Sequence, residues 1–357
     1  YSWRWIFYIN VPVGILALIM ISTFVEDPPY LKRNKGTRID YMGLGFLAIA
    51  LTCLQVTLDK GQEVDWFGAV WVRWFVVIAA VALVAFVVRE LRTSAPLVNL
   101  RIFVDRNLAT GTFLIGILGI IIYGTTTLLP LFLQDLIGYT AYNSGLAVAP
   151  RGFGAIASMM IAGTLVGKWD ERLLITIWVV IRGISLLMLG HLNLEMGMSN
   201  VVWPNIINGF ANGFLFVPLT TLTMKTLPRE LMGAGTGLYN LLRNMGASFG
   251  ISLVTTLLTR GEQRHQVNQG ANLTATNPVY WSLVQQLSHY FAAQSGAPTG
   301  RAEALGQIYL NLKQQAMLLS YIDDFRLLGY LSFFCIPFLF FFRNAEKTDK
   351  AEIVVGH

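Results

Sequence analysis

Apolar runs of about 18 to 25 residues recur along the whole chain, and this feature limits the possible folds more than any other. Each run is long enough to cross the hydrocarbon core of a bilayer as a helix. A water-soluble chain of 357 residues would divide into domains with polar linkers and would carry about 25% charged residues. This chain carries 13% and is 54% hydrophobic. The sequence therefore predicts an all-α, polytopic membrane protein.

Nine membrane-spanning helices are predicted from the apolar runs. They cover residues 5–24, 40–58, 68–88, 107–133, 144–167, 172–191, 201–225, 232–258 and 322–342. Pro130 and Pro218 lie inside two of them, which a membrane helix tolerates because neighbouring groups satisfy the freed carbonyls.

The basic residues predict the orientation of these spans. More than half of the 26 Lys and Arg residues lie in or beside alternate loops, such as 26–39 and 89–106, and the opposite loops are poor in them. By the positive-inside rule the basic side is cytoplasmic, so residue 1 lies outside and the C-terminus inside. Because the positive charge is spread over short loops, the net charge of +6 does not indicate nucleic-acid binding.

No group of residues indicates catalysis, a metal centre or a cofactor. The two cysteines lie inside apolar runs and are predicted to be buried free thiols. The four histidines are scattered, without metal-ligand spacing or a partner carboxylate. These residues are Cys53, Cys335, His191, His265, His289 and His357. The sequence therefore indicates a protein that is not an enzyme.

Several segments, in order along the chain, resemble the EmrB/QacA-type branch of the major facilitator superfamily, which consists of drug:proton antiporters with 14 helices. WRWIFYINVPVG (3–14) resembles the start of family helix six, and LDKGQEVDWF (58–67) the loop between two extra central helices. PLVNLRIFVDRNLATG (96–111), LLPLFLQDLIGYTAYNSGLAVAPRG (128–152), GFLFVPLTTLTMKTLP (213–228) and GLYNLLRNMGASFG (237–250) resemble parts of helices seven to eleven.

The resemblance implies a domain organisation in which nine of the fourteen helices are present and five precede residue 1. Residues 1–25 would be the last helix of the N-terminal bundle, and 26–106 the two central helices with cytoplasmic linkers. Residues 107–343 would form the C-terminal six-helix bundle, and 344–357 a cytoplasmic tail.

The polar segment 260–321 is predicted to leave the membrane as a periplasmic helical hairpin. Apolar residues recur at helical spacing over 279–291 and 305–319, and SGAPTG (295–300) between them indicates a turn. This hairpin would cap the outward opening, dock an adaptor protein or form a passive cover.

The family resemblance also implies the activity. It indicates a multidrug efflux permease of the bacterial inner membrane that exports hydrophobic or amphipathic drug-like compounds, driven by the proton gradient and without a cofactor. The outer loop resembles the Gram-negative, EmrB-like type, which works with a periplasmic membrane-fusion adaptor and an outer-membrane channel. A transporter of a metabolite or another small molecule on the same fold is the alternative, because fold does not fix substrate.

Charges and polar groups inside the spans are the candidates for a substrate cavity, because they are costly in lipid. Arg243 matches the family pattern and shares a helix face with Asn240 and Asn244. Arg182 matches no motif, and a structural pairing is the favoured role for it. The predicted substrate cavity consists of Tyr123, Gln134, Asn208, Asn212, Phe216, Asn240, Arg243 and Asn244. Each of these residues can instead serve helix packing.

A cytoplasmic gate is predicted in GTLVGKWDERLL (163–174), which resembles a degenerate copy of the superfamily's cytoplasmic loop motif. Its glycines would allow close helix approach and its charged residues would form a lock, or the segment is an ordinary basic turn. The gate residues are Gly163, Gly167, Lys168, Asp170 and Arg172.

Two further features complete the expected sites. No Asp or Glu lies deep in a predicted span, and Asp135, at the outer end of one, is the possible proton site or an interfacial cap. In the family, the main coupling carboxylate lies in helix one.

The pairs Gly209/Gly213 and Gly246/Gly250 have the spacing of close helix packing.

Overall fold

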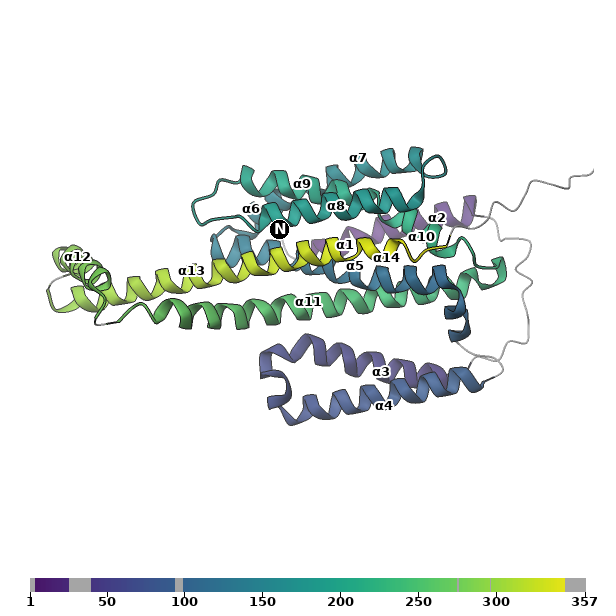
Figure 1. The fold of residues 1–357 in the computed structure, drawn as a ribbon, viewed down its shortest axis with the longest axis horizontal. Helices are drawn as coiled ribbons and strands as arrows, with labels where there is room; N and C mark the ends of the chain where they lie inside the picture. Colours follow the sequence, from purple (N-terminus) through teal and green to yellow (C-terminus); the bar gives the residue numbers. More distant parts are fainter. Residues whose placement is uncertain (1–3, 26–39, 94–98, 275, 296, 344–357) are drawn as a thin grey trace, which may run out of the picture. The chain divides into compact units, whose positions relative to one another are not determined.

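The computed structural model describes residues 4–25, 40–93, 99–274, 276–295 and 297–343, and these residues are almost entirely helical (Figure 1). The chain divides into two compact units, residues 1–40 and 41–357. The first contains α1 (Trp5–Tyr8) and α2 (Asn10–Phe24), which correspond to the predicted span 5–24. The predicted segments 26–39 and 344–357 lie outside the described residues.

Seven segments of the described chain are long and apolar enough to cross a membrane, which confirms the all-α polytopic fold. They are Tyr41–Lys60, Val70–Arg92, Arg106–Leu136, Ala141–Leu165, Glu171–Leu189, Ser199–Met224 and Arg229–Gly270. Of the two other predicted spans, α2 is a shorter apolar helix of 15 residues. The span 322–342 falls on the end of α13 (Ala297–Phe334) and on α14 (Ile336–Leu339).

The central hairpin consists of α3 (Tyr41–Lys60) and α4 (Val70–Arg92), which pack along each other (Figure 1). Two short 3₁₀ turns, Gln62–Val64 and Trp66–Gly68, connect them. Asp65 and Trp66 adopt left-handed backbone angles, with φ of 50° and 53°, which reverses the chain. Cys53 on α3 is half-buried, so the prediction of a buried thiol is wrong for it, whereas Cys335 is buried.

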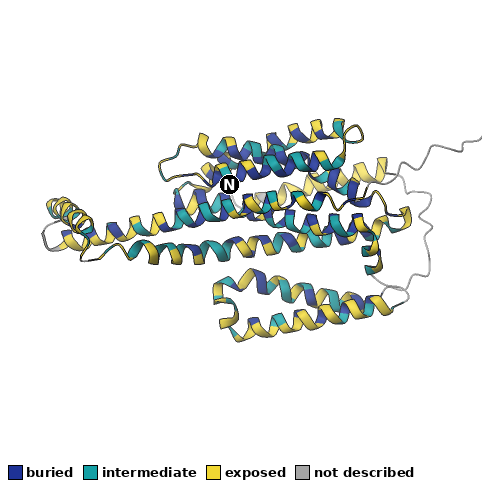
Figure 2. Cartoon of the chain, in the orientation of Figure 1, coloured by how far each residue is buried: buried dark blue, intermediate teal, exposed yellow. Residues whose placement is uncertain are grey.

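The C-terminal bundle is built around α5 (Arg106–Leu131), which has buried residues along its whole length (Figure 2). A single π-turn, Phe132–Leu136, ends it, and α6 (Ala141–Val148) and α7 (Pro150–Leu165) follow. The other bundle helices are α8 (Glu171–Leu189), α9 (Ser199–Gly213), α10 (Phe216–Met224), α11 (Met232–Gly270) and α13.

Close helix contacts at glycine hold two helix pairs together. A Cβ atom on Gly246 of α11 would overlap the backbone of Gly116 on α5, and one on Gly250 would lie 2.6 Å from the Cα of Ile120. Likewise, a Cβ on Gly209 of α9 would overlap the backbone of Arg151 on α7. In a membrane, such small residues let helix backbones approach each other.

In the outer segment two helices pack together, as predicted for the hairpin, but the adjoining helices run into this segment without a break. α11 continues unbroken to Gly270, and its 39 residues extend about 58 Å, far beyond the ~30 Å hydrocarbon core. α12 (Pro278–Ser295) corresponds to the first predicted helix, but the second is continuous with the last span as α13 (Figure 1). No helix breaker separates 305–319 from 322–342, so the helix runs through the change from polar to apolar sequence.

Side chains join α11 to α13 beyond the predicted span. Nη2 of Arg264 lies 3.1 Å from Oδ2 of Asp323, and Nε2 of His265 lies 2.8 Å from the same oxygen. Gln266 Nε2 donates to the Tyr309 hydroxyl at 3.2 Å. These contacts join the two helices through polar and charged side chains.

Candidate functional site

The most deeply buried charge among the described residues is Arg182, in the middle of α8. Its side chain has no solvent exposure. Nη1 donates to Oδ1 of Asn208 at 2.7 Å and to Oδ1 of Asn212 at 3.3 Å. Because Asn208 and Asn212 are four residues apart, they lie on one face of α9 and can bind the same guanidinium. We call these three residues the arginine centre.

The arginine centre lies beside a break in a membrane-spanning helix. α9 ends at Gly213 and α10 begins at Phe216. Between them, Phe214 N–H donates to the carbonyl of Ala211 at 3.0 Å and Leu215 N–H to that of Asn212 at 3.3 Å, so the chain tightens to a turn. Pro218 follows and lacks an N–H group. Interrupted helices of this kind line the binding sites of many secondary transporters.

The surroundings of Arg182 are positive and aromatic. Arg151 on α7 lies within electrostatic range, and its Nη1 donates to Oγ1 of Thr126 at 3.0 Å. The guanidinium carbon of Arg182 lies 5.8 Å from the ring centroid of Trp178, one helical turn earlier. Within the described ranges no carboxylate forms an ion pair with Arg182. The centre is therefore a buried positive charge that is stabilised only by neutral groups.

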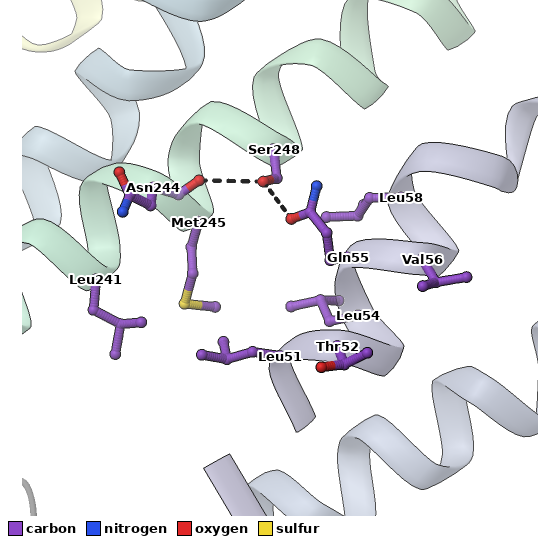
Figure 3. A pocket seen from close by; sticks show the side chains of 10 residues that line it. All are labelled: Leu51, Thr52, Leu54, Gln55, Val56, Leu58, Leu241, Asn244, Met245 and Ser248. Carbon is purple, nitrogen blue, oxygen red and sulfur yellow. Dashed lines mark hydrogen bonds between the residues drawn. The ribbon is translucent and has the colours of Figure 1, made fainter. Parts of the chain in front are cut away.

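A second candidate is a pocket of about 400 Å³ between α3 and α11 (Figure 3). Gln55 and Ser248 face each other across it, and the Ser248 hydroxyl donates to Oε1 of Gln55 at 2.6 Å. Asn244 lies one turn before Ser248. The other lining residues are Leu51, Thr52, Leu54, Val56, Leu58, Leu241 and Met245. Apolar walls with a few polar groups suit a hydrophobic ligand that has one or two polar atoms.

The structure divides the predicted substrate-cavity residues between these places. Asn208 and Asn212 belong to the arginine centre, and Asn244 lines the α3–α11 pocket. Arg243 is half-buried, and its Nε is buried without a hydrogen-bond partner among the described residues. The remaining predicted residues lie elsewhere: Asn240 is half-buried, Phe216 packs on the core, and Tyr123 and Gln134 are exposed.

The predicted gate segment forms a tight turn. Gly167 has a φ of 83°, the left-handed conformation that glycine adopts readily. Asp170 caps α8 by accepting the Arg172 N–H at 2.9 Å, and Arg172 Nη2 donates to the Phe342 carbonyl at 2.6 Å. Across the residues that the structure covers, no ion pair joins Lys168, Asp170 and Arg172.

An ion pair in this region joins two residues that were not predicted as part of the gate. Lys225, after α10, lies 3.3 Å from Glu171 at the start of α8. The expected close helix approach at Gly163 is also not present, since no described atom lies within 4 Å of a Cβ placed there. The role of this segment as a gate remains a prediction.

Carboxylates near the outer helix ends differ in burial. Asp135, the predicted proton site, is exposed on the π-turn after α5. Asp324 on α13 is only 3% exposed, and its Oδ2 has no hydrogen-bond partner among the described residues. It lines a pocket of about 620 Å³ together with Arg260, Arg264 and Arg326. The described residues contain no group of three or more His, Cys, Asp or Glu side chains that could hold a metal.

Sequence reasoning missed Gln55, Ser248 and Trp178 and underestimated Arg182. The first two are polar residues within apolar spans, but they lie 193 residues apart, and nothing in the sequence predicts that they meet. Trp178 and Arg182 have the i, i+4 spacing that places both side chains on one helix face, which is a signal that could have been used.

Comparison with known proteins identifies relatives of the chain. The family described as Major Facilitator Superfamily matches residues 1–251. The chain is 33% identical over 322 residues to the multidrug export protein EmrB of Escherichia coli K12, covering 90% of this chain and 61% of that protein. It is 32% identical over 341 residues to the fatty acid resistance protein FarB of Neisseria gonorrhoeae, covering 94% and 65%. The chain thus spans less than two thirds of the length of these relatives.

Proposed function

The chain belongs to the major facilitator superfamily, and from this premise we propose that it takes part in multidrug efflux as the membrane-spanning part of a secondary transporter. The compounds exported would be hydrophobic or amphipathic, and the energy would come from proton antiport without a cofactor. The transporter would lie in the inner membrane of a bacterium and deliver its substrates to a periplasmic adaptor and an outer-membrane channel.

The observation that carries the proposal is the α3–α11 pocket. Its wall is mostly apolar; Gln55 and Ser248 form a hydrogen-bonded polar pair in it, and Asn244 and Thr52 add two further polar side chains. Such a lining binds molecules by burial of apolar surface and sets few hydrogen-bonding requirements, so it accepts substrates of varied structure. Met245 adds a flexible, polarisable side chain that adapts to different shapes.

The names of the relatives support the same substrate class. EmrB of Escherichia coli is named for multidrug export and FarB of Neisseria gonorrhoeae for fatty acid resistance. The compounds that these names describe share apolar surface. A substrate with many polar groups would require a matching set of buried partners, and the α3–α11 pocket does not offer one.

The first test is drug transport by the full-length protein and by a variant with a filled pocket. In everted membrane vesicles, wild type is expected to accumulate a hydrophobic dye, and a protonophore is expected to abolish the accumulation. Met245→Trp is expected to raise the apparent KM about tenfold, because an added side chain in an apolar pocket commonly costs 1–3 kcal/mol of binding. The dye accumulation of Asp135→Asn is compared with that of wild type under the same proton gradient, because Asp135 is our proposed local proton site.

The matched control is Val81→Trp, which places the same side chain at an exposed position on α4. Its KM is expected to equal that of wild type. An unchanged KM in Met245→Trp would remove the pocket from the proposal. If wild type confers no resistance against a broad drug panel and accumulates no dye, the efflux function is wrong and a metabolite transporter becomes the better hypothesis.

The outer segment is our proposed docking site for the adaptor. Gln266 and Tyr309 are hydrogen-bonded across α11 and α13, so a six-residue Gly-Ser linker, which reaches about 20 Å, can replace residues 267–308. We expect this deletion to abolish drug resistance in cells while everted vesicles still transport the dye at the wild-type rate. Loss of vesicle transport in a protein that still reaches the membrane would contradict docking and indicate a role in the transport cycle.

A further inference from the structure

Four hydrogen-bond donors around Arg182 are buried without an acceptor in the described part of the chain. They are Nε and Nη2 of Arg182, Nε1 of Trp178 and Nδ2 of Asn208. All three side chains have no solvent exposure. An unsatisfied buried donor costs about 1–3 kcal/mol, and more when the group is charged. Four such donors around one guanidinium therefore form a site that a ligand with several acceptor atoms would satisfy.

The unused donors of Arg182 have a specific geometry. Nη1 is occupied by the side-chain oxygens of Asn208 and Asn212. The other two nitrogens, Nε and Nη2, direct one N–H each along the same edge of the planar guanidinium. This edge binds the two oxygens of a carboxylate through parallel hydrogen bonds. A carboxylate gives each of these N–H groups its own oxygen in line, whereas a single water oxygen or a spherical ion must share both bonds at bent angles.

The charge of the site favours the same ligand. Arg151 adds a second positive charge within electrostatic range, and no described carboxylate pairs with Arg182. The Trp178 ring beside the guanidinium provides an apolar wall, and its unused Nε1–H can bind an oxygen. A ligand with one carboxylate and an apolar body would satisfy the donors and bury its chain among the helices.

The helix break provides a way for the site to open. Asn208 and Asn212 precede the interruption between α9 and α10, where the backbone has turn-type hydrogen bonds at Phe214 and Leu215 and the Gly213 N–H donates to Oγ of Ser158 at 3.0 Å. A change of backbone angles in this short segment moves the two asparagines relative to α8 without breaking a regular helix. The guanidinium edge can therefore become accessible while the bundle remains folded.

We propose that the arginine centre is a binding site for carboxylate-bearing amphiphiles, with the Nε/Nη2 edge of Arg182 as the recognition element. This inference rests on the proposed export function, and it defines a substrate class for it: compounds with one carboxylate on an apolar body. The carboxylate accepts two hydrogen bonds from Arg182, Nε1 of Trp178 is a further donor beside the guanidinium, and Asn208 holds Nη1 on the opposite side.

The experiment measures binding of tritiated decanoate to the purified full-length protein in nanodiscs, with decylammonium as a ligand of equal length and opposite charge. Arg182→Lys keeps the positive charge but lacks the planar edge. Asn208→Asp has nearly the same shape and introduces a carboxylate that competes for the guanidinium. Each variant is expected to bind decanoate at least about tenfold more weakly: Arg182→Lys loses the two parallel hydrogen bonds to a charged group, and Asn208→Asp already neutralises the guanidinium and repels a second carboxylate. Binding of decylammonium is expected to stay unchanged.

A loss of folding does not explain the expected result for Asn208→Asp, because an added counter-charge should raise the melting temperature of that variant. Wild-type affinity for decanoate in both variants would overturn the proposal. So would displacement of decanoate by chloride at equal concentration, since the ligand would then be any small anion. Export is measured separately: if wild type exports neither compound, the efflux function fails, while the decanoate affinities still decide the carboxylate site.

Discussion

Replacing Gly246 with leucine is expected to prevent the C-terminal bundle from forming. A Cβ atom on this residue would overlap the backbone of Gly116, and backbone cannot rotate away as a side chain can. α11 would have to move off α5, which would also separate Gly250 from Ile120. Overpacking commonly costs 1–3 kcal/mol, and we expect about 3 kcal/mol or more here because backbone meets backbone. The measurement is the monodisperse fraction of the detergent-extracted full-length protein in size-exclusion chromatography.

The matched control lies on the same helix. No described atom lies within 4 Å of a Cβ placed on Gly237, so Gly237→Leu is expected to give the same monodisperse fraction as wild type. Gly246→Ala is expected to fall between wild type and Gly246→Leu, because its overlap is smaller. A well-folded Gly246→Leu variant that melts like wild type would show that α5 and α11 do not pack at this distance.

The second large effect is expected at the arginine centre. Asn208→Leu removes the acceptor 2.7 Å from Nη1 of Arg182 and leaves a buried cation with fewer partners. A hydrogen bond to a charged group is worth about 1.5–3 kcal/mol, so we expect the melting temperature to fall by roughly 5 °C. Arg182→Met/Asn208→Leu is expected to recover much of the loss, because replacing both members of a buried polar pair by apolar residues is often neutral or stabilising.

The double-mutant cycle isolates this pair from general effects of substitution. Its coupling energy is expected to be at least about 1 kcal/mol, as is usual for residues in one hydrogen-bond network. The control cycle uses Lys60 and Glu63, an exposed i, i+3 ion pair at 2.7 Å, for which no measurable coupling is expected. Additive effects at Arg182 and Asn208 would contradict the contact between α8 and α9.

These two positions concern different aspects of one helical bundle. The glycine contacts between α5 and α11 hold the bundle in a single arrangement, because closely packed backbones leave no room for sliding. The arginine centre lies beside a helix break, where turn-type hydrogen bonds and one bond from the Gly213 N–H to Oγ of Ser158 replace the regular helical pattern. A rigid helix pair beside an interrupted helix is an arrangement in which substrate binding can move one element against the rest.

The sequence alone could predict the features that are set within a single segment of the chain. The length and apolarity of the runs determine the membrane helices, because a bilayer imposes a minimum length on every span. The all-α polytopic fold was therefore readable from the residues, the superfamily was indicated by the resemblance of several segments to it, and both are confirmed. The small-residue spacing at Gly209/Gly213 and Gly246/Gly250 indicated close packing for the same reason, since it marks one face of a single helix.

Only the tertiary structure decided which faces meet. Arg182 had no motif and its partners lie 26 and 30 residues away, so its place in a polar centre depended on how α9 packs against α8. Gln55 and Ser248 are 193 residues apart, and their pocket exists only where the central hairpin contacts α11. The continuity of α13 from polar to apolar sequence was likewise hidden, because hydropathy changes at the membrane surface while helical hydrogen bonding does not. Hydropathy and spacing are properties of one segment, whereas a binding site is a property of several segments packed together.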